Sequence, residues 1–257
     1  MARVAIIGAA GRMGRELCRA AIDDPEIELV GGTVEPGAPE LGSDLGNLCG
    51  TVNMGLYATE ELPEADVIIE FSTPEATIEH LRFETPHVIG TTGLSADQQA
   101  KVGAAASEKP IVHAPNMSVG VNLLGELVRE LSEKLGSSYD IELVESHHRH
   151  KQDAPSGTAL FLAQAAAEGR GAQLDEMATY GRKGRQPRQE GEIGIHAIRG
   201  GAVVGEHKVT FYSAGEEVEV THRALSRQTF AMGAMRAARF AAEASPGLYT
   251  MSDVLDS

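Results

Sequence analysis

A glycine-rich turn near the start of the chain limits the possible folds more than any other stretch. A buried strand is predicted over residues 4–7, Gly8-Ala9-Ala10-Gly11-Arg12-Met13-Gly14 follows it, and residues 15–22 have a helical pattern. Glycines between a strand and a helix are typical of dinucleotide-binding turns, where they permit a tight turn and close approach of a pyrophosphate. The spacing is G-x-x-G-x-x-G, with Ala10 keeping the additional position small. This turn predicts a Rossmann-type domain.

An acidic residue follows the second predicted strand at a distance that fits the same fold. The strand is predicted over residues 28–34, and Glu35 comes directly after it. In dinucleotide-binding domains an acid about 20 residues beyond the glycine turn bonds the ribose hydroxyls. The alternative is that Glu35 is an ordinary exposed loop carboxylate, but its spacing favours a role in cofactor binding.

Strands and helices continue to alternate up to about residue 117. Strands are predicted over residues 67–71, 87–89 and 111–113, and helices over 74–83 and 95–106. Such alternation indicates a parallel sheet, whose ligands lie beyond the carboxyl ends of the strands. The residues predicted at those ends, as candidates for binding a nicotinamide and its ribose, are Gly90, Thr91, Thr92, Ala114, Pro115, Asn116 and Met117. The alternative is that these residues form simple turns.

The organisation changes near residue 118. A longer helix is predicted over residues 119–135, and a helix of small residues over 229–244 is expected to pack back on the first domain. The predicted domains are therefore residues 1–117, completed by 228–257, for dinucleotide binding, and residues 118–227 for a second α+β domain. The fold class is α/β with a parallel sheet, plus a mixed or antiparallel sheet in the second domain.

The end of the second domain is predicted to be mostly β-structure. Residues 169–191 are polar, basic and rich in glycine, which is typical of a mobile loop. Residues 193–198, 202–212 and 217–222 then alternate like the strands of an antiparallel meander. Gly200-Gly201 and Ala214-Gly215 are predicted to be its hairpin turns.

A basic segment lies within this second domain, although the chain as a whole is acidic. The formal net charge is -15, yet His147, His148, Arg149, His150 and Lys151 follow one another shortly after an apolar strand predicted over residues 141–144. A group of cations within an acidic chain indicates a local site for an anion. Such a site predicts a small anionic substrate.

A helix start follows the basic segment and supports the same prediction. Ser156 is a favourable N-cap for a helix predicted over residues 159–167. The N–H groups of Gly157 and Thr158 would then point out of the helix start, where a carboxylate or phosphate is commonly held.

Two other interpretations of the histidines have less support. Histidines at a strand end are often only solvated. A zinc site usually shows spaced Cys, His and carboxylate pairs, whereas His147 and His148 are adjacent and on a strand point to opposite faces. Lys151 would also repel a cation, so no metal is expected.

The bulk properties of the chain exclude several classes of protein. A length of 257 residues allows one large or two small domains with an ample core. The first residues run straight into a strand and no apolar run approaches the roughly 20 residues of a bilayer span. Cys18 and Cys49 do not make a disulfide framework. We expect a cytoplasmic protein that binds neither membranes nor nucleic acid, because nucleic-acid binding needs basic surface.

In these motifs the chain resembles the dihydrodipicolinate reductase family, the 4-hydroxy-tetrahydrodipicolinate reductases of the diaminopimelate route to lysine. The most specific match is Glu145-x-His147-His148-x-x-Lys151-x-Asp153-Ala154-Pro155-Ser156-Gly157-Thr158-Ala159. Further matches are the glycine turn, Gly90-Thr91-Thr92-Gly93, the stretch from Asn116 to Asn122, Arg199-Gly200-Gly201, Val204-Gly205-Glu206-His207 and His222-x-Ala224-x-Ser226-Arg227. The resemblance covers nearly the whole chain.

The resemblance implies an oxidoreductase that reduces the dehydrated cyclic dicarboxylate with hydride from NADH or NADPH. It implies a homotetramer built by the sheet of the second domain. It also implies roles for individual residues: His147 as proton donor or acceptor, Lys151 as proton donor, and His148, Gly157 and Thr158 as substrate-binding residues. Cofactor contacts would fall on the turn from Gly8 to Met13, on Glu35, and on the predicted strand ends at Gly90 to Thr92 and Ala114 to Met117.

One departure from the family bears on the cofactor. Many members have an arginine after the acid that ends the second strand, where it can receive a 2′-phosphate, and here Pro36 occupies that place. NADH is therefore the expected cofactor, with NADPH also possible.

Another two-domain dehydrogenase of amino or keto acids remains the alternative enzyme. A nicotinamide-sensing regulatory protein would have no use for His147 and Lys151, and a structural scaffold would not need the glycine turn.

Overall fold

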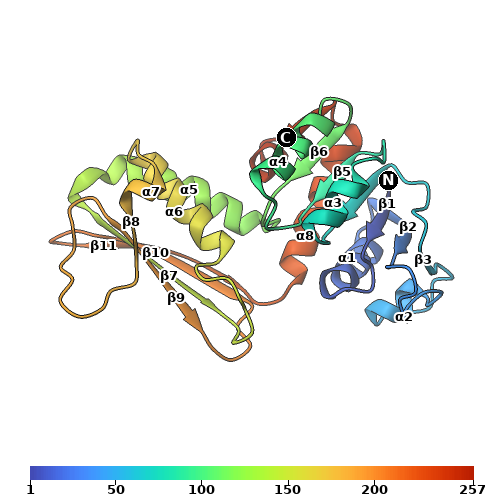
Figure 1. Cartoon of the computed structure of the whole chain (residues 1–257), viewed down its shortest axis with the longest axis horizontal. Helices are drawn as coiled ribbons and strands as arrows, with labels where there is room; N and C mark the ends of the chain where they lie inside the picture. The colour runs from blue at the N-terminus through green and yellow to red at the C-terminus, as the bar shows by residue number, and fades with distance from the viewer. The chain divides into compact units, whose positions relative to one another are not determined.

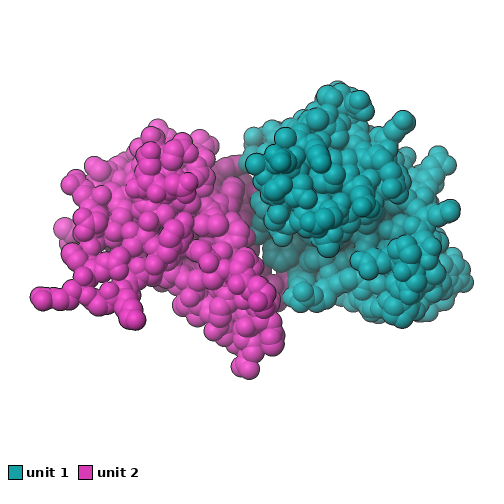
Figure 2. All heavy atoms as spheres, viewed as in Figure 1, with its two compact units in different colours: residues 1–119, 227–257 teal, residues 120–226 magenta.

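The computed structural model describes residues 1–257 and divides them into two units. The first unit contains Met1–Val119 and Arg227–Ser257, and the second contains Gly120–Ser226 (Figure 2). The chain thus leaves the first unit once and returns to it near its end. Each unit has its own sheet and its own apolar core.

A parallel sheet of seven strands forms the centre of the first unit (Figure 1). Its order is β12-β6-β5-β4-β1-β2-β3, and every adjacent pair is parallel. The strands are β1 (Ala2–Ile7), β2 (Ile27–Thr33), β3 (Ala58–Thr59), β4 (Val67–Glu70), β5 (His87–Ile89), β6 (Pro110–His113) and β12 (Gly247–Tyr249). Strands β1 to β6 lie in the order β3-β2-β1-β4-β5-β6, which is that of a Rossmann fold. The predicted fold class is confirmed.

Helices cover both faces of this sheet because alternate strand residues point to opposite sides. The helices of this unit are α1 (Arg12–Asp23), α2 (Leu45–Cys49), α3 (Pro74–His80), α4 (Ala96–Ala105), α8 (Gln228–Glu243) and α9 (Met251–Leu255). Val88 and Val112 belong to the core under α1 and α8, whereas Ile89 and Ile111 belong to the core under α3 and α4. The late helix α8 packs on α1, as the pattern of small residues predicted.

A mixed sheet of five strands forms the second unit, with the order β11-β10-β7-β9-β8. The strands are β7 (Asp140–His147), β8 (Ala178–Tyr180), β9 (Ile193–Arg199), β10 (Gly205–Tyr212) and β11 (Glu217–Ala224). The helices are α5 (Val119–Leu135), α6 (Gly157–Gly169) and α7 (Leu174–Met177), with a 3-10 turn at Gly136–Ser138. Ile141 and Leu143 of β7 face the apolar core shared with α5 and α6. Glu142 lies between these two residues on the strand and therefore points to the other face of the sheet.

The predicted antiparallel meander is wrong for its first strand. β9 is parallel to β7 and does not pair with β10, because β7 lies between them. Gly200-Gly201 is accordingly no hairpin turn but part of a connection across the end of β7, where the Gly200 N–H donates to the His147 carbonyl at 2.9 Å. Alternation within a strand reports which face is buried and does not report which neighbour the strand takes.

The segment predicted to be a loop over residues 169–191 contains regular structure. It includes α7 and the edge strand β8, which pairs in parallel with β9. Both elements are short, so the local sequence gave little periodicity from which to predict them. The other hairpin turn was predicted correctly, because residues 213–216 join β10 to β11 in an antiparallel pair.

Candidate active site

The glycine turn lies at the carboxyl end of β1 and starts α1. Gly8 has a φ of 74°, a left-handed conformation that favours glycine. Gly11 is the N-cap residue of α1 and makes no side-chain cap, so the first N–H groups of the helix are not covered by a capping side chain. The N–H of Ala9 donates to the Thr33 carbonyl at 2.9 Å, which ties the turn to β2. This arrangement suits a pyrophosphate at a helix N-terminus.

Gly14 permits the close contact between α1 and the turn. A Cβ atom placed there would lie 2.0 Å from the Gly8 carbonyl oxygen. Gly14→Ala is therefore expected to force the turn open, with a loss of roughly 1–3 kcal/mol of unfolding free energy from overpacking and weaker NADH binding. Chemical denaturation and NADH fluorescence titration measure the two effects.

Gly103→Ala provides a matched control for that substitution. Gly103 lies within α4, and no atom lies within 4 Å of a Cβ built there. Alanine is favoured over glycine in a helix interior by about 1 kcal/mol, so this variant should be at least as stable as the unchanged protein. Equal denaturation midpoints for the two variants would contradict the packing argument for Gly14.

The other predicted cofactor residues also follow carboxyl ends of strands in this sheet. Glu35 lies beyond β2 and is exposed, and Arg12 in the first turn of α1 is exposed as well. Gly90 follows β5 and packs on the Phe71 ring, since a Cβ there would lie 2.3 Å from ring carbons. These positions leave backbone and polar groups at one edge of the sheet, where the fold predicts a ligand.

Two of the predicted cofactor residues, Thr91 and Met117, have buried side chains that pack inside the first unit. Thr91 is 2% exposed, accepts from the Ser72 N–H at 3.1 Å and is bonded by Thr77 at 2.8 Å. Met117 is fully buried in the core of the first unit. Any contact of these two residues with a cofactor would be made by their backbones.

Sequence patterns did not indicate the buried carboxylate that lies beneath this edge. Glu70, the last residue of β4, has no exposed surface and lies 2.8 Å from His80 Nδ1 and 3.0 Å from His87 Nε2. Burial raises its pKa, but hydrogen bonds from the two histidines and Ser72 outweigh burial and lower the pKa to about 2. The Thr77 hydroxyl lies 3.2 Å from Glu70 Oε1 and 2.8 Å from Thr91 Oγ1. If it donates to the carboxylate, it accepts from Thr91, so Glu70 helps to hold Thr77 and Thr91 in place.

In the second unit, the basic segment turns at the end of β7 and does not remain extended. β7 ends at His147, and the Lys151 N–H donates to the His148 carbonyl at 3.1 Å to close a turn. On an extended strand His147 and Lys151 would point to the same face, but the turn breaks that alternation. A turn replaces the alternation because the strand loses its pairing partner once β9 ends opposite His147 at Arg199. The Lys151 ammonium lies 2.9 Å from Asp153 Oδ1.

The predicted helix start after the segment is confirmed. Ser156 is the N-cap of α6, and its hydroxyl accepts from the Ala159 N–H at 3.1 Å. Gly157 and Thr158 are the first residues of the helix, and a Cβ built on Gly157 would meet no atom within 4 Å. The helix start therefore has open space beside it. Ser156 Oγ also lies 3.1 Å from His207 Nε2 on β10.

His147 is held by a buried carboxylate on its own strand. Its Nδ1 lies 2.6 Å from Glu145 Oε2, and Glu145 has no exposed surface. Arg199 on β9 donates to both oxygens of Glu145 at 2.8 Å, and the Ser156 N–H donates to Oε1 at 3.0 Å. The sequence motifs contain Glu145, Arg199 and His207 but indicate no role for these three residues. The spacing of Glu145 and His147, two residues apart on a strand, places them on one face.

The charges around His147 shift the pKa values of the histidines at this site. Burial lowers the pKa of His147, and Lys151 and Arg199 lower it further, against the opposing effect of Glu145. Burial and the neighbouring His147 lower the pKa of His207 to about 4. The two rings meet edge to face with centroids 5.1 Å apart. Both histidines are therefore neutral at neutral pH in the free protein.

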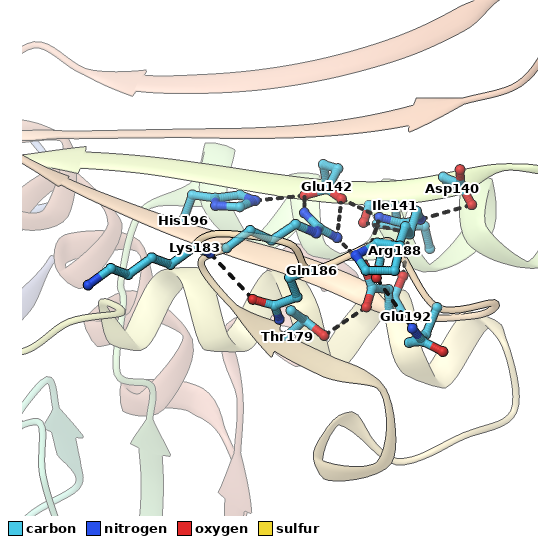
Figure 3. A network of polar contacts seen from close by, with 12 residues as sticks. Asp140, Ile141, Glu142, Thr179, Lys183, Gln186, Arg188, Glu192 and His196 are labelled. Atoms are coloured by element: carbon cyan, nitrogen blue, oxygen red, sulfur yellow. Dashed lines mark hydrogen bonds and ion pairs between the residues drawn. The ribbon is translucent and has the colours of Figure 1, made fainter.

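A second charged network lies on the other face of the same sheet (Figure 3). Glu142 Oε2 lies 2.7 Å from His196 Nε2, and Arg182 and Arg188 pair with the same carboxylate. Arg182 and Arg188 also pair with Glu192. These contacts fasten residues 182–192 onto β7 and β9. The network has the same kinds of partner as Glu145 but lies on the face away from the helix start.

Neither unit contains a group of three or more His, Cys, Asp or Glu side chains that could hold a metal ion. No helix has both the length and the apolar character that crossing a membrane requires.

The Rossmann-type unit and the second unit with its buried His–Glu–Arg site define the class of two-domain NAD(P)-dependent oxidoreductases. Residues 2–117 match the family profile described as dihydrodipicolinate reductase, N-terminus, and residues 120–255 match that described as dihydrodipicolinate reductase, C-terminus. The chain belongs to the dihydrodipicolinate reductase family.

Similar proteins agree with this assignment. A 4-hydroxy-tetrahydrodipicolinate reductase of Rubrobacter xylanophilus is 68% identical over 258 residues, covering 100% of this chain and 99% of the relative. The enzyme of the same name from Chromohalobacter salexigens is 48% identical and covers 99% and 98%. Among solved structures, a dipicolinate-bound dihydrodipicolinate reductase from Paenisporosarcina sp. TG-14 has a TM-score of 0.74 at 24% identity, covering 97% of each chain. That structural likeness concerns the fold.

Proposed function

We propose that the protein reduces 4-hydroxy-tetrahydrodipicolinate, through its dehydrated form, to tetrahydrodipicolinate with NAD(P)H, in the diaminopimelate route to lysine. The observation that carries the proposal is His147, held by a buried Glu145–Arg199 pair beside Lys151 and the start of α6. This is the segment most specific to the family. The named relatives at 68% and 48% identity support the choice of substrate.

The chemistry of such a substrate matches the residues of the second unit. The substrate is a dianion, so its carboxylates need cations and helix N–H groups, which Lys151, His148, Gly157 and Thr158 would supply. NAD(P)H supplies the hydride when bound. A proton must then reach the neighbouring atom, and a positioned acid or base contributes about 10²–10⁴-fold to such a step. We assign that proton transfer to His147 and Lys151.

The two units would divide the work. Residues 1–117 with 228–257 would form the dinucleotide-binding domain, with contacts from the turn at Gly8 to Met13, from Glu35, and from the loops at Gly90 to Thr92 and Ala114 to Met117. Residues 118–227 would bind the substrate and form a homotetramer through the sheet. The tetramer is what the family resemblance implies, and the sheet of this unit is its expected interface. Light scattering gives the oligomeric mass. We place the protein in the cytoplasm.

A single coupled assay tests the function. Aspartate semialdehyde and pyruvate are incubated with the upstream synthase, and the loss of NADH or NADPH absorbance is followed on addition of the protein. Turnover that depends on the synthase is expected. Nucleotide oxidation with other keto or amino acids, and none with the synthase product, would favour the alternative dehydrogenase.

We further propose that NADH serves at least as well as NADPH. The exposed Glu35 can accept ribose hydroxyls but would repel a 2′-phosphate. Between Gly31 and Asp44 there is no Lys or Arg to offset that charge, and Arg12 is the nearby cation that could do so. The ratio of kcat/KM for NADH to that for NADPH, at saturating substrate, is expected to be one or higher. A strong preference for NADPH would contradict the proposal.

A further inference from the structure

The buried Glu145 carboxylate receives hydrogen bonds from three different residues. Each of its oxygens receives an Arg199 donor at 2.8 Å, in the parallel fork that guanidinium and carboxylate groups form. Oε2 also receives His147 Nδ1, and Oε1 receives the Ser156 N–H. Three separate elements, β7, β9 and the start of α6, thus converge on one buried carboxylate.

The contacts also fix the charge of this group. Burial would raise the pKa of Glu145, but the hydrogen bonds from Arg199, His147 and Ser156 together lower its pKa below the ordinary value. Glu145 is therefore an anion at neutral pH and can only accept hydrogen bonds. His147 must then donate from Nδ1.

A hydrogen on Nδ1 leaves Nε2 of the neutral ring as an acceptor. The surroundings of Nε2 agree with such a role. Gly205, the first residue of β10, lies beside it, and a Cβ there would be 3.1 Å from Nε2. The absence of a side chain at Gly205 keeps this edge of the ring uncovered. His207 packs on the ring but has a strongly lowered pKa of about 4, so it does not compete as a base.

We propose that Glu145 and Arg199 are positioning residues that hold His147 with its hydrogen on Nδ1, so that Nε2 takes up a proton from solvent and then passes that proton to the substrate, which returns the ring to its neutral Nδ1–H form. Arg199 keeps Glu145 ionised, and Glu145 orients the ring. The proposal rests on the function proposed above only for its kinetic part. The arrangement of the ring itself can be measured without turnover.

The test begins with the unchanged protein, labelled with ¹⁵N and ¹³C at histidine. The ring shifts of His147, identified by the signal missing in His147→Gln, report which nitrogen holds the hydrogen. The Nδ1–H form is expected. A ring with its hydrogen on Nε2 would overturn the proposal, even if the variants below do not fold and even if the protein has another substrate.

The kinetic test uses Glu145→Gln, with Glu145→Asp as the conservative variant. Glutamine removes the charge and can present an N–H to His147, which favours the other tautomer, so kcat should fall by roughly 10²-fold or more with a smaller change in KM. Aspartate keeps the charge on a shorter side chain and should restore part of kcat. The NADH affinity should not change. A kcat near that of the unchanged protein in Glu145→Gln would overturn the proposal.

The pH profile separates positioning from simple stabilisation. The charged and titratable groups around His147 are Lys151 in the following turn, Arg199 on β9, His207 on β10 and Glu145 itself. Of these, Glu145 raises the pKa of His147. Its loss should therefore move the histidine titration in the NMR spectrum, and the matching limb of kcat/KM, to lower pH. An unmoved titration with reduced thermal stability would show a structural role only.

Glu142→Gln is a matched control on the same strand. Glu142 also pairs with a histidine and with arginine side chains, two of them where Glu145 has one, but on the opposite face of the sheet. Its loss should leave kcat, the His147 tautomer and the pH profile unchanged, whatever it does to stability. An equal loss of kcat in both glutamine variants would assign the effect to the sheet and overturn the specific role of Glu145.

Discussion

Replacing His147 by glutamine is expected to lower kcat by roughly 10²- to 10⁴-fold, the usual contribution of a positioned acid or base. Glutamine is close to histidine in length and can still donate to Glu145, which lies 2.6 Å from the ring nitrogen. It has no group that exchanges a proton near neutral pH. The loss should therefore fall on kcat more than on KM, because the interaction removed is made mainly in the transition state. Steady-state kinetics with the coupled assay measures both.

His196→Gln is the control for this substitution. His196 lies on β9 of the same unit, where it bonds Glu142 on the face away from the helix start. It should keep the kcat of the unchanged protein, and NADH affinity measured by fluorescence should survive in both variants. A His147→Gln variant with nearly full kcat would show that Lys151 or a bound water delivers the proton.

Replacing Lys151 by methionine should lower kcat and also weaken substrate binding. The ammonium lies 2.9 Å from Asp153 Oδ1, and Asp153 has an exposed carboxylate that a substrate carboxylate can replace. We expect kcat to fall roughly 10²-fold from the lost proton donor. KM should rise about tenfold or more, since a hydrogen bond to a charged group contributes about 1.5–3 kcal/mol. The same assay, over a range of substrate concentrations, separates the two effects.

Lys134→Met serves as the control for that variant. Lys134 is exposed in the last turn of α5, in the same unit but outside the basic segment. Its loss should change neither parameter. If Lys151→Met raises KM and leaves kcat intact, Lys151 binds the substrate and His147 alone handles the proton.

The first unit could be predicted well because its information is local. Each predicted strand is a short apolar run, and the turn at Gly8 predicts which edge of the sheet would bind a ligand. The short elements β3, β12, α2 and α9 were not predicted. The helix predicted over residues 95–106 begins at Ser95, which caps it with a complete capping box. A parallel order then follows from alternation and crossover handedness, with few competing topologies.

The second unit could be predicted only in part, because its strand order depends on long-range pairing. The alternating patterns over 193–198 and 217–222 were sufficient to predict strands but suggested a meander, whereas β7 inserts between β9 and β10. The short elements α7 and β8 are stabilised by neighbours distant in sequence, including the ion pairs of Arg182 and Arg188. The conformational preferences of neighbouring residues do not report contacts between residues that are distant in the sequence.

The sequence by itself determined the family, the glycine turn, the helix start at Ser156 and the residues of the basic segment. It also placed Glu145 and His147 on one face, because residues two apart on a strand share a side. Only the tertiary structure decided that Arg199 reaches the Glu145 carboxylate. The parallel register of β7 and β9 places Arg199 opposite His147, although the two residues are far apart in the sequence. The tertiary structure also decided that Lys151 lies on a turn. Both facts depend on where pairing ends in the sheet, and pairing partners are chosen by burial of whole strands and not by neighbouring residues.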